Sequence, residues 1–108
     1  MPRESLSTLT EPMYYVLLAL TEPLCGIEIM ERVKELSHGR LAIGPGTLYT
    51  MLAKFEDNGI ISQTDERGSS GKRKTYSITV RGVELLKQEY RRLKRQAEDG
   101  KAVMEELK

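Results

Sequence analysis

The last third of the chain carries the feature that most limits how it can fold, a heptad of apolar or small residues. After Thr79 their spacing alternates between three and four positions for more than three repeats; the members are Val83, Leu86, Tyr90, Leu93, Ala97, Gly100, Met104 and Leu107. This period is typical of a long helix that packs against another helix. The chain has only 108 residues, so a helix projecting past its small core needs a partner to cover the stripe. We therefore predict a homodimer.

The predicted interface consists of the side chains of this stripe, namely Val83, Leu86, Tyr90, Leu93, Ala97, Met104 and Leu107. Gly100 is the weak point, because glycine inside a helix costs about 1 kcal/mol relative to alanine. Either the helix breaks at Gly100 or two chains cross closely there. The periodicity supports two chains and leaves four open.

Size and composition limit the chain to one small domain with a helical extension. Hydrophobic residues make up 39% and charged residues 31% of the sequence, a balance unlike that of a disordered tail. The longest apolar run, residues 13–20, is shorter than the ~18 residues of a membrane span, and the amino terminus has no apolar signal core. Cys25 is the single cysteine, which favours a reducing compartment. We expect a cytoplasmic protein with no membrane contact.

Helix-start signals divide the first half of the chain. Thr10, Glu11 and Pro12 are typical of a helix start and predict a buried central helix over residues 13–20. Thr21, Glu22 and Pro23 repeat this pattern, so we expect a second helix to begin there. Its apolar or small positions recur at helical spacing and are Gly26, Ile29, Met30, Val33 and Leu36. Residues 41–43 are too short for a helix and are interpreted as a small strand.

A third helix and a hairpin complete the fold prediction. Pro45 suits the first turn of a helix over residues 45–58, which Asn58 and Gly59 close. Residues 60–64 and 74–78 are β-prone runs around a loop rich in Gly and Ser. The order of elements is that of a winged helix-turn-helix, mainly α with a small β-wing. We assign residues 1–79 to this domain and residues 80–108 to a long C-terminal dimerisation helix.

The outward face of the third helix suits the major groove of DNA. Its inward stripe is Leu48, Met51, Leu52 and Phe55; the positions left facing outward or on the flanks include Gly46, Thr47, Tyr49, Thr50 and Lys54. Small and hydrogen-bonding residues in the first turns let the backbone approach base edges. These five residues are our predicted DNA-binding set on this helix. An ordinary solvent-exposed helix is the alternative.

A cluster of basic residues follows this helix in the sequence, although the net charge of the chain is only +1. The loop between the two predicted strands and its edges carry Arg67, Lys72, Arg73 and Lys74, which suit phosphate or minor-groove contact. A soluble turn that protects a sheet edge is the alternative.

Tyr14 and Tyr15 point about 100° apart on the first helix, so one belongs to the core. We place Tyr15 among the residues that contact DNA, with the dimer interface as its other assignment.

Nothing in the sequence predicts catalysis, a metal or a cofactor. Cys25 and His38 could form a nucleophile and base, but no third residue is placed to orient them. A buried structural cysteine is the simpler interpretation. One Cys and one His do not close a metal site.

Four segments resemble the PadR-like transcriptional regulators. Residues 13–20 are similar to the first helix of that family, residues 25–29 to the start of its second helix, with Ile27 in place of an aromatic residue, residues 45–49 to its recognition helix, and residues 72–79 to its wing. The resemblance implies a dimeric repressor that binds an inverted-repeat operator and is released by a ligand or another signal. It also implies DNA contacts from Thr47, Tyr49 and the wing bases. Some small members hold flat aromatic drugs between their subunits with tryptophans on the last helix. This chain has no tryptophan, so the resemblance does not extend to that drug site.

Two hypotheses therefore follow from the sequence. The first is a dimeric sequence-specific DNA-binding regulator, a repressor, with helix 45–58 and wing 60–78 on double-stranded DNA and a small-molecule inducer as its releasing signal. The second is a winged-helix module that binds proteins without specific DNA binding, since one fold serves several uses. An enzymatic role has almost no support among the residues.

Overall fold

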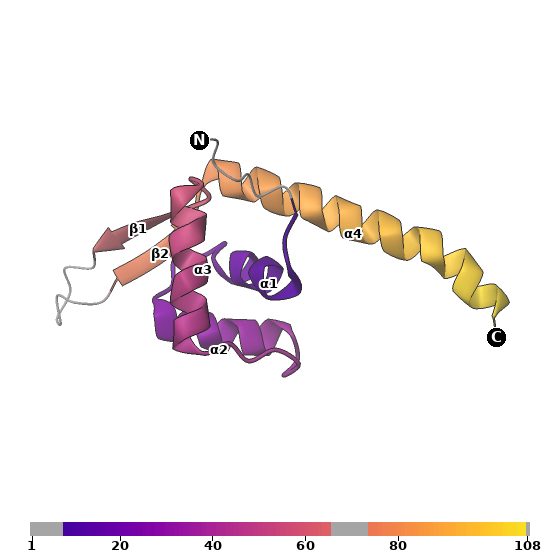
Figure 1. Ribbon diagram of the computed structural model, residues 1–108, viewed down its shortest axis with the longest axis horizontal. Helices are drawn as coiled ribbons and strands as arrows, with labels where there is room; N and C mark the ends of the chain where they lie inside the picture. The colour runs from indigo at the N-terminus through magenta and orange to yellow at the C-terminus, as the bar shows by residue number, and fades with distance from the viewer. Residues whose placement is uncertain (1–7, 66–73, 108) are drawn as a thin grey trace.

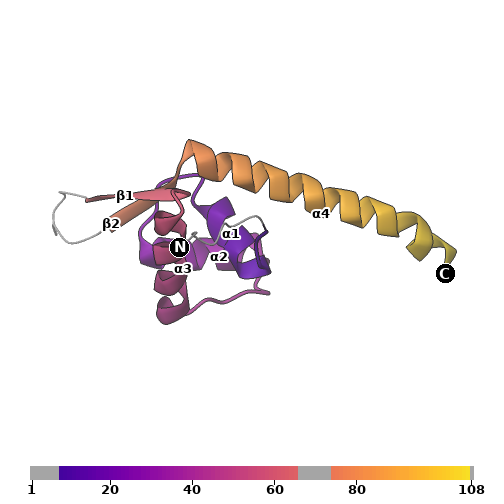
Figure 2. The ribbon, with the colours of Figure 1, turned by 45° about the horizontal axis from the view of Figure 1, so that its top comes forward.

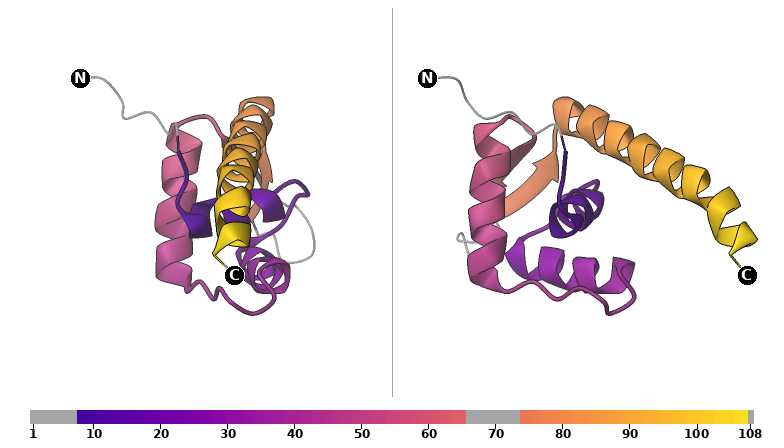
Figure 3. Two further views of the ribbon diagram at one scale, coloured as in Figure 1. Left: turned by 90° about the vertical axis from the view of Figure 1, so that its right-hand side faces the viewer. Right: turned by 45° about the vertical axis from the view of Figure 1, so that its right-hand side comes forward.

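Four helices and one hairpin make up the protein in the computed structural model, which describes residues 8–65 and 74–107. The elements in chain order are α1 (Glu11–Ala19), α2 (Gly26–Leu36), α3 (Pro45–Asp57), β1 (Ile61–Asp65), β2 (Lys74–Ile78) and α4 (Val80–Glu106). Helix α1 lies between α2, α3 and α4 (Figure 3). Helix α4 leaves this unit on the side opposite to the hairpin (Figures 1 and 2). This is the predicted winged helix-turn-helix with its long C-terminal helix.

Helix α1 is the centre of the core, as predicted. Thr10 caps it, since its hydroxyl accepts a hydrogen bond from the Met13 N–H at 3.4 Å. Val16 and Leu17 have no exposed surface, nor does Leu20 directly after the helix. The residues that cover α1 come from the apolar stripes of α2 and α3 and from the start of α4, and they include Ile29, Val33, Leu48, Leu52, Phe55 and Leu86.

The predicted start of α2 at residues 21–23 is wrong. The hydroxyl of Thr21 donates to the Leu18 carbonyl at 2.9 Å, so it belongs to the end of α1. The chain then runs extended through Leu24, and α2 begins at Gly26 after Cys25. The Cys25 N–H donates to the Glu28 carboxylate at 2.9 Å, which satisfies one of the free amides that every helix start leaves.

The predicted strand at residues 41–43 is also wrong. Leu41 and Ile43 pack against the core, yet the segment pairs with no strand in the described part of the chain. Strand β2 instead pairs with β1 and, on its other edge, with Leu24 through an isolated bridge to Tyr76. The two backbone hydrogen bonds of that bridge measure 3.0 and 2.9 Å. Leu24 therefore takes the third position of the small sheet.

The turn from the hairpin into α4 is a close backbone contact. The Thr79 hydroxyl accepts from the Gly82 N–H at 3.1 Å and donates to the Gly59 carbonyl at 2.7 Å. A Cβ on Gly82 would lie 2.2 Å from the Ile60 carbonyl oxygen, which is far inside contact distance. Helix α4 then continues through Gly100 without interruption, so of the two alternatives for Gly100 the helix break does not occur.

We expect Gly82→Ala to destabilise the fold by about 3 kcal/mol, because the new methyl group overlaps backbone that cannot rotate away. Urea unfolding followed by circular dichroism measures the loss. The matched control is Gly100→Ala, since a Cβ there meets no atom within 4 Å and alanine is the better helix former. Equal stability of the two variants would contradict the close contact at Gly82.

Candidate nucleic-acid interface

The outward face of α3 is free in the structure. Gly46, Thr47, Thr50 and Lys54 are all exposed, and Tyr49 is 48% exposed. The opposite face is buried by Leu48, Leu52 and Phe55. The predicted division of this helix into an inward and an outward face is confirmed except at Met51, which was expected in the inward stripe but is only partly buried.

The start of α3 suits a negatively charged partner. Its first turn carries no acidic side chain, whereas the first turns of α1 and α2 contain Glu11 and Glu28. The exposed amides and the helix dipole make a helix N-terminus electrically positive. Among α1, α2 and α3, only the first turn of α3 has no acidic side chain to offset this positive potential; the first turn of α4 lacks one as well.

Tyr49 is less free than its exposure suggests. Its hydroxyl oxygen would lie 2.1 Å from a Cβ on Gly26, so the ring rests on the first residue of α2. Because Gly26 has no side chain, the phenol lies directly beside the α2 backbone. Tyr49 thus joins the exposed face of α3 to the amino end of α2.

The remaining predicted DNA-contact residues are the basic residues of the wing and Tyr15. Lys74 is exposed at the start of β2, and Arg67, Lys72 and Arg73 lie outside the described residues. Tyr15 is not part of the α3 face. Its hydroxyl accepts a hydrogen bond from Arg40 at 2.9 Å, and the same guanidinium pairs with Glu11 at 3.1 Å and lies 5.9 Å from the Tyr15 ring centre.

The stripe of α4 divides into a covered and an open part. Leu86 is only 8% exposed and belongs to the core of its own unit, which leaves it little surface for a partner, and Val83 is partly buried. Farther along, Tyr90, Leu93, Met104 and Leu107 are 39–70% exposed, and Ala97 is exposed. Val103, which the heptad leaves out, is 53% exposed. The unpartnered apolar surface therefore begins at Tyr90.

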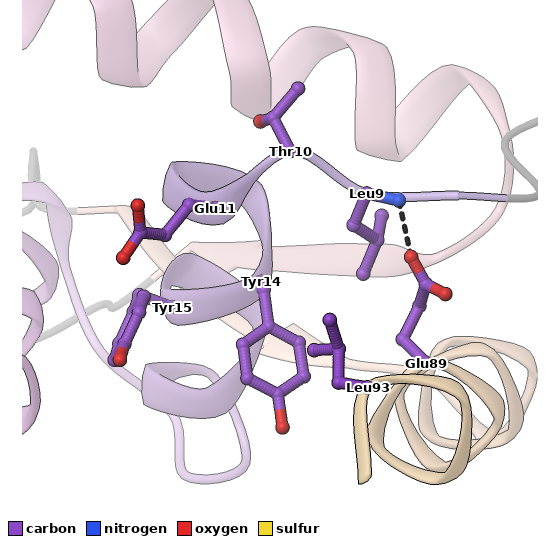
Figure 4. Close-up of a pocket in the computed structure, with 7 residues that line it drawn as sticks. All are labelled: Leu9, Thr10, Glu11, Tyr14, Tyr15, Glu89 and Leu93. Carbon is purple, nitrogen blue, oxygen red and sulfur yellow. Dashed lines mark hydrogen bonds between the residues drawn. The ribbon is translucent and has the colours of Figure 1, made fainter. Parts of the chain in front are cut away.

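A buried carboxylate between these two parts is the residue that the sequence analysis missed. Glu89 is 2% exposed; one of its oxygens accepts from the Leu9 N–H, and Arg92 donates to both oxygens at 2.6 and 3.2 Å. The hydrogen bond from Arg92 lowers the pKa of Glu89. Figure 4 shows the hydrogen bond between Leu9 and Glu89, at a pocket of about 310 Å³ where Tyr14 lies beside Leu93. Glu89 ties α4 to the segment before α1.

The other candidate chemistry finds no support in the geometry. Cys25 is buried at the start of α2, and His38 is exposed beyond its end, so a helix of about 16 Å separates them. Within residues 8–65 and 74–107, no three His, Cys, Asp or Glu side chains gather as a metal site would need.

None of the helices in this part of the chain has the length and apolar character needed to cross a bilayer.

We expect Glu89→Gln to lower the stability by about 1.5 kcal/mol at pH 7, because charge-assisted hydrogen bonds contribute about that much. The pKa of Glu89 is lowered from 4.5 by folding, so the carboxylate stabilises the fold above pH 4.5. This contribution is lost as the pH falls through the folded-state pKa. Urea midpoints between pH 3 and 7 should therefore converge for the two proteins at the acid end.

The matched control is Glu98→Gln, which changes an exposed carboxylate on the same helix and should leave the midpoints unchanged. A deficit of Glu89→Gln that stays constant down to pH 3 would show that the charge of Glu89 is irrelevant.

Comparison with known proteins identifies the family. Residues 16–88 match the transcriptional regulator PadR-like family. A PadR family regulator of Eggerthella lenta is 25% identical with a TM-score of 0.71, over 86% of this chain and 80% of that one. A PadR family regulator of Clostridium difficile is 26% identical with a TM-score of 0.67, over 83% and 97%.

A transcriptional regulator of Clostridium thermocellum shares the fold at 22% identity, with a TM-score of 0.67 over 91% of this chain and 93% of the other. None of the curated protein sequences matches significantly. The family match covers the second half of α1, then α2, α3, β1, β2 and the start of α4. The chain belongs to the PadR-like family of DNA-binding transcriptional regulators.

Proposed function

We propose that the protein is a dimeric repressor that binds an inverted-repeat operator. Helix α3 of each subunit enters a major groove, and the two half-sites lie about one helical turn, ~34 Å, apart. The hairpin lies on the flanking backbone with Lys74 and the loop bases. The observation that carries this proposal is the amino-terminal half of α3, which has a polar, exposed outward face and no acidic side chain.

The dimer part of the proposal rests on α4. A helix of 27 residues is about 40 Å long, and its apolar side chains from Tyr90 onward are exposed in the monomer, with Leu93 the most covered at 39% exposed. We assign this part to the partner subunit and residues 1–79 to DNA binding. Because Leu86 and Glu89 pack on the DNA-binding unit, a change in the angle between two α4 helices moves both α3 helices. A small-molecule inducer would release the operator through this contact.

Replacing Lys72, Arg73 and Lys74 together by alanine should weaken binding to every DNA sequence, because phosphate contacts carry no sequence information. Fluorescence anisotropy on the upstream DNA of the gene and on a shuffled fragment measures both affinities. The slope of log K against log salt should fall by about 0.9 for each lost phosphate contact.

The control replaces Lys87, Arg91 and Lys94, three exposed bases of α4, and should leave binding nearly unchanged. Equal losses in both variants, or no preference for the native fragment, would favour the protein-binding module instead.

Leu93→Glu should give monomers and lose operator affinity, whereas Gln88→Glu on the other side of α4 should do neither. A monomeric Leu93→Glu that binds at full strength would refute the dimer.

Gly26→Ala should weaken DNA binding about tenfold with little loss of stability. The new methyl group occupies the position of the Tyr49 hydroxyl, and the half-exposed ring can swing away at small cost. Anisotropy and thermal unfolding measure the two effects. Tyr49→Ala should bind as weakly as Gly26→Ala, and the double variant should add nothing further; additive losses would mean that Gly26 acts independently of Tyr49.

A further inference from the structure

A shallow groove runs along the proposed DNA-binding face, between the start of α1 and the first turns of α3. Its volume is about 670 Å³, and its lining consists of Thr10, Met13, Gly46, Thr47, Thr50, Met51 and Lys54. Two methionines and three threonine methyl groups make it largely apolar, on a face that is otherwise polar. The groove is therefore suited to apolar groups presented by whatever lies on α3.

The composition of α3 restricts how this face can distinguish bases. Arg, Asn, Gln and Lys are the side chains that recognise guanine or adenine with two hydrogen bonds. Of these, α3 contains only Lys54, which could contact guanine. The hydroxyls of Thr47 and Thr50 both donate and accept, so they pair with several base edges. Hydrogen bonds from α3 alone therefore discriminate weakly.

Among the four standard bases, only thymine presents an apolar group in the major groove, its 5-methyl group. We propose that each operator half-site places thymine methyl groups in this groove, against Thr47, Thr50 and Met51. This inference rests on the proposed function and adds which base the site prefers.

The floor of the groove is suited to this role. Met13 is 8% exposed and packs in the core, so its position is fixed, while the unbranched Met51 adapts to the shape of a ligand. A Cβ on Gly46 would meet no atom within 4 Å, so a base pair has open space to approach the backbone there. Burial of one methyl group corresponds to about a fourfold gain in affinity, or about fifteenfold for one in each half-site.

The test begins with selection of bound sequences from a random double-stranded DNA library by the full-length protein. The selected site is then synthesised with thymine and with uracil, which pairs identically but lacks the methyl group. We expect the uracil form to bind at least about fifteenfold more weakly in anisotropy. Binding of the two forms within twofold would overturn the inference.

A double-mutant cycle separates groove contacts from a change in DNA shape. Thr47→Ser and Thr50→Ser together remove two methyl groups and keep both hydroxyls. In this variant the uracil penalty should shrink to about a quarter or less, whereas Thr21→Ser, an exposed threonine outside the groove, should retain it fully. An undiminished penalty would place the thymine contact elsewhere and overturn the inference.

The outcomes distinguish this inference from the proposal beneath it. If the library yields a preferred sequence that binds equally with thymine and uracil, the protein is a specific DNA binder and the methyl readout alone is wrong. If it yields no preferred sequence, both are overturned.

Discussion

The burial of α1 is the constraint on which the rest of the structure depends. Val16, Leu17 and Leu20 have no exposed surface, so a helix of only nine residues has to be covered on nearly every side. Helices α2 and α4 pack on it, and β2 is tied to its end by the hydrogen bond from the Ile78 N–H to the Leu20 carbonyl at 3.0 Å. Because α1 occupies the centre, α3 buries a single stripe and keeps its other face free.

The same packing gives α4 two roles along its length. Its first turns are part of the domain, since Gly82 lies against the Ile60 carbonyl and Leu86 belongs to the core. Glu89 adds a buried carboxylate that ties this helix to Leu9. A buried charge without its hydrogen bonds is costly, so the direction in which α4 leaves the domain is defined by these contacts. Beyond Leu93, which lies beside Tyr14, the apolar side chains of the helix are exposed.

Local signals in the sequence predicted most of the elements, and long-range contacts account for the errors. Thr10 before α1, Gly59 after α3 and Thr79 before α4 act on neighbouring backbone, so each could be found from spacing. Thr21 looks the same as Thr10, but its hydroxyl bonds backward to Leu18, and only the pairing of Leu24 with Tyr76 makes that choice clear. These two residues are more than fifty positions apart.

The candidate site shows the same division. The outward face of α3 followed from helical periodicity, because the inward stripe defines it. Burial of Glu89 could not be predicted, since a glutamate within a run of charges is normally exposed and its partner Leu9 is eighty residues away in sequence. The contact of Tyr49 with Gly26 also depends on how two helices cross. Helical periodicity predicts on which side of its helix a residue lies, but it does not predict which residue of another element that side chain contacts.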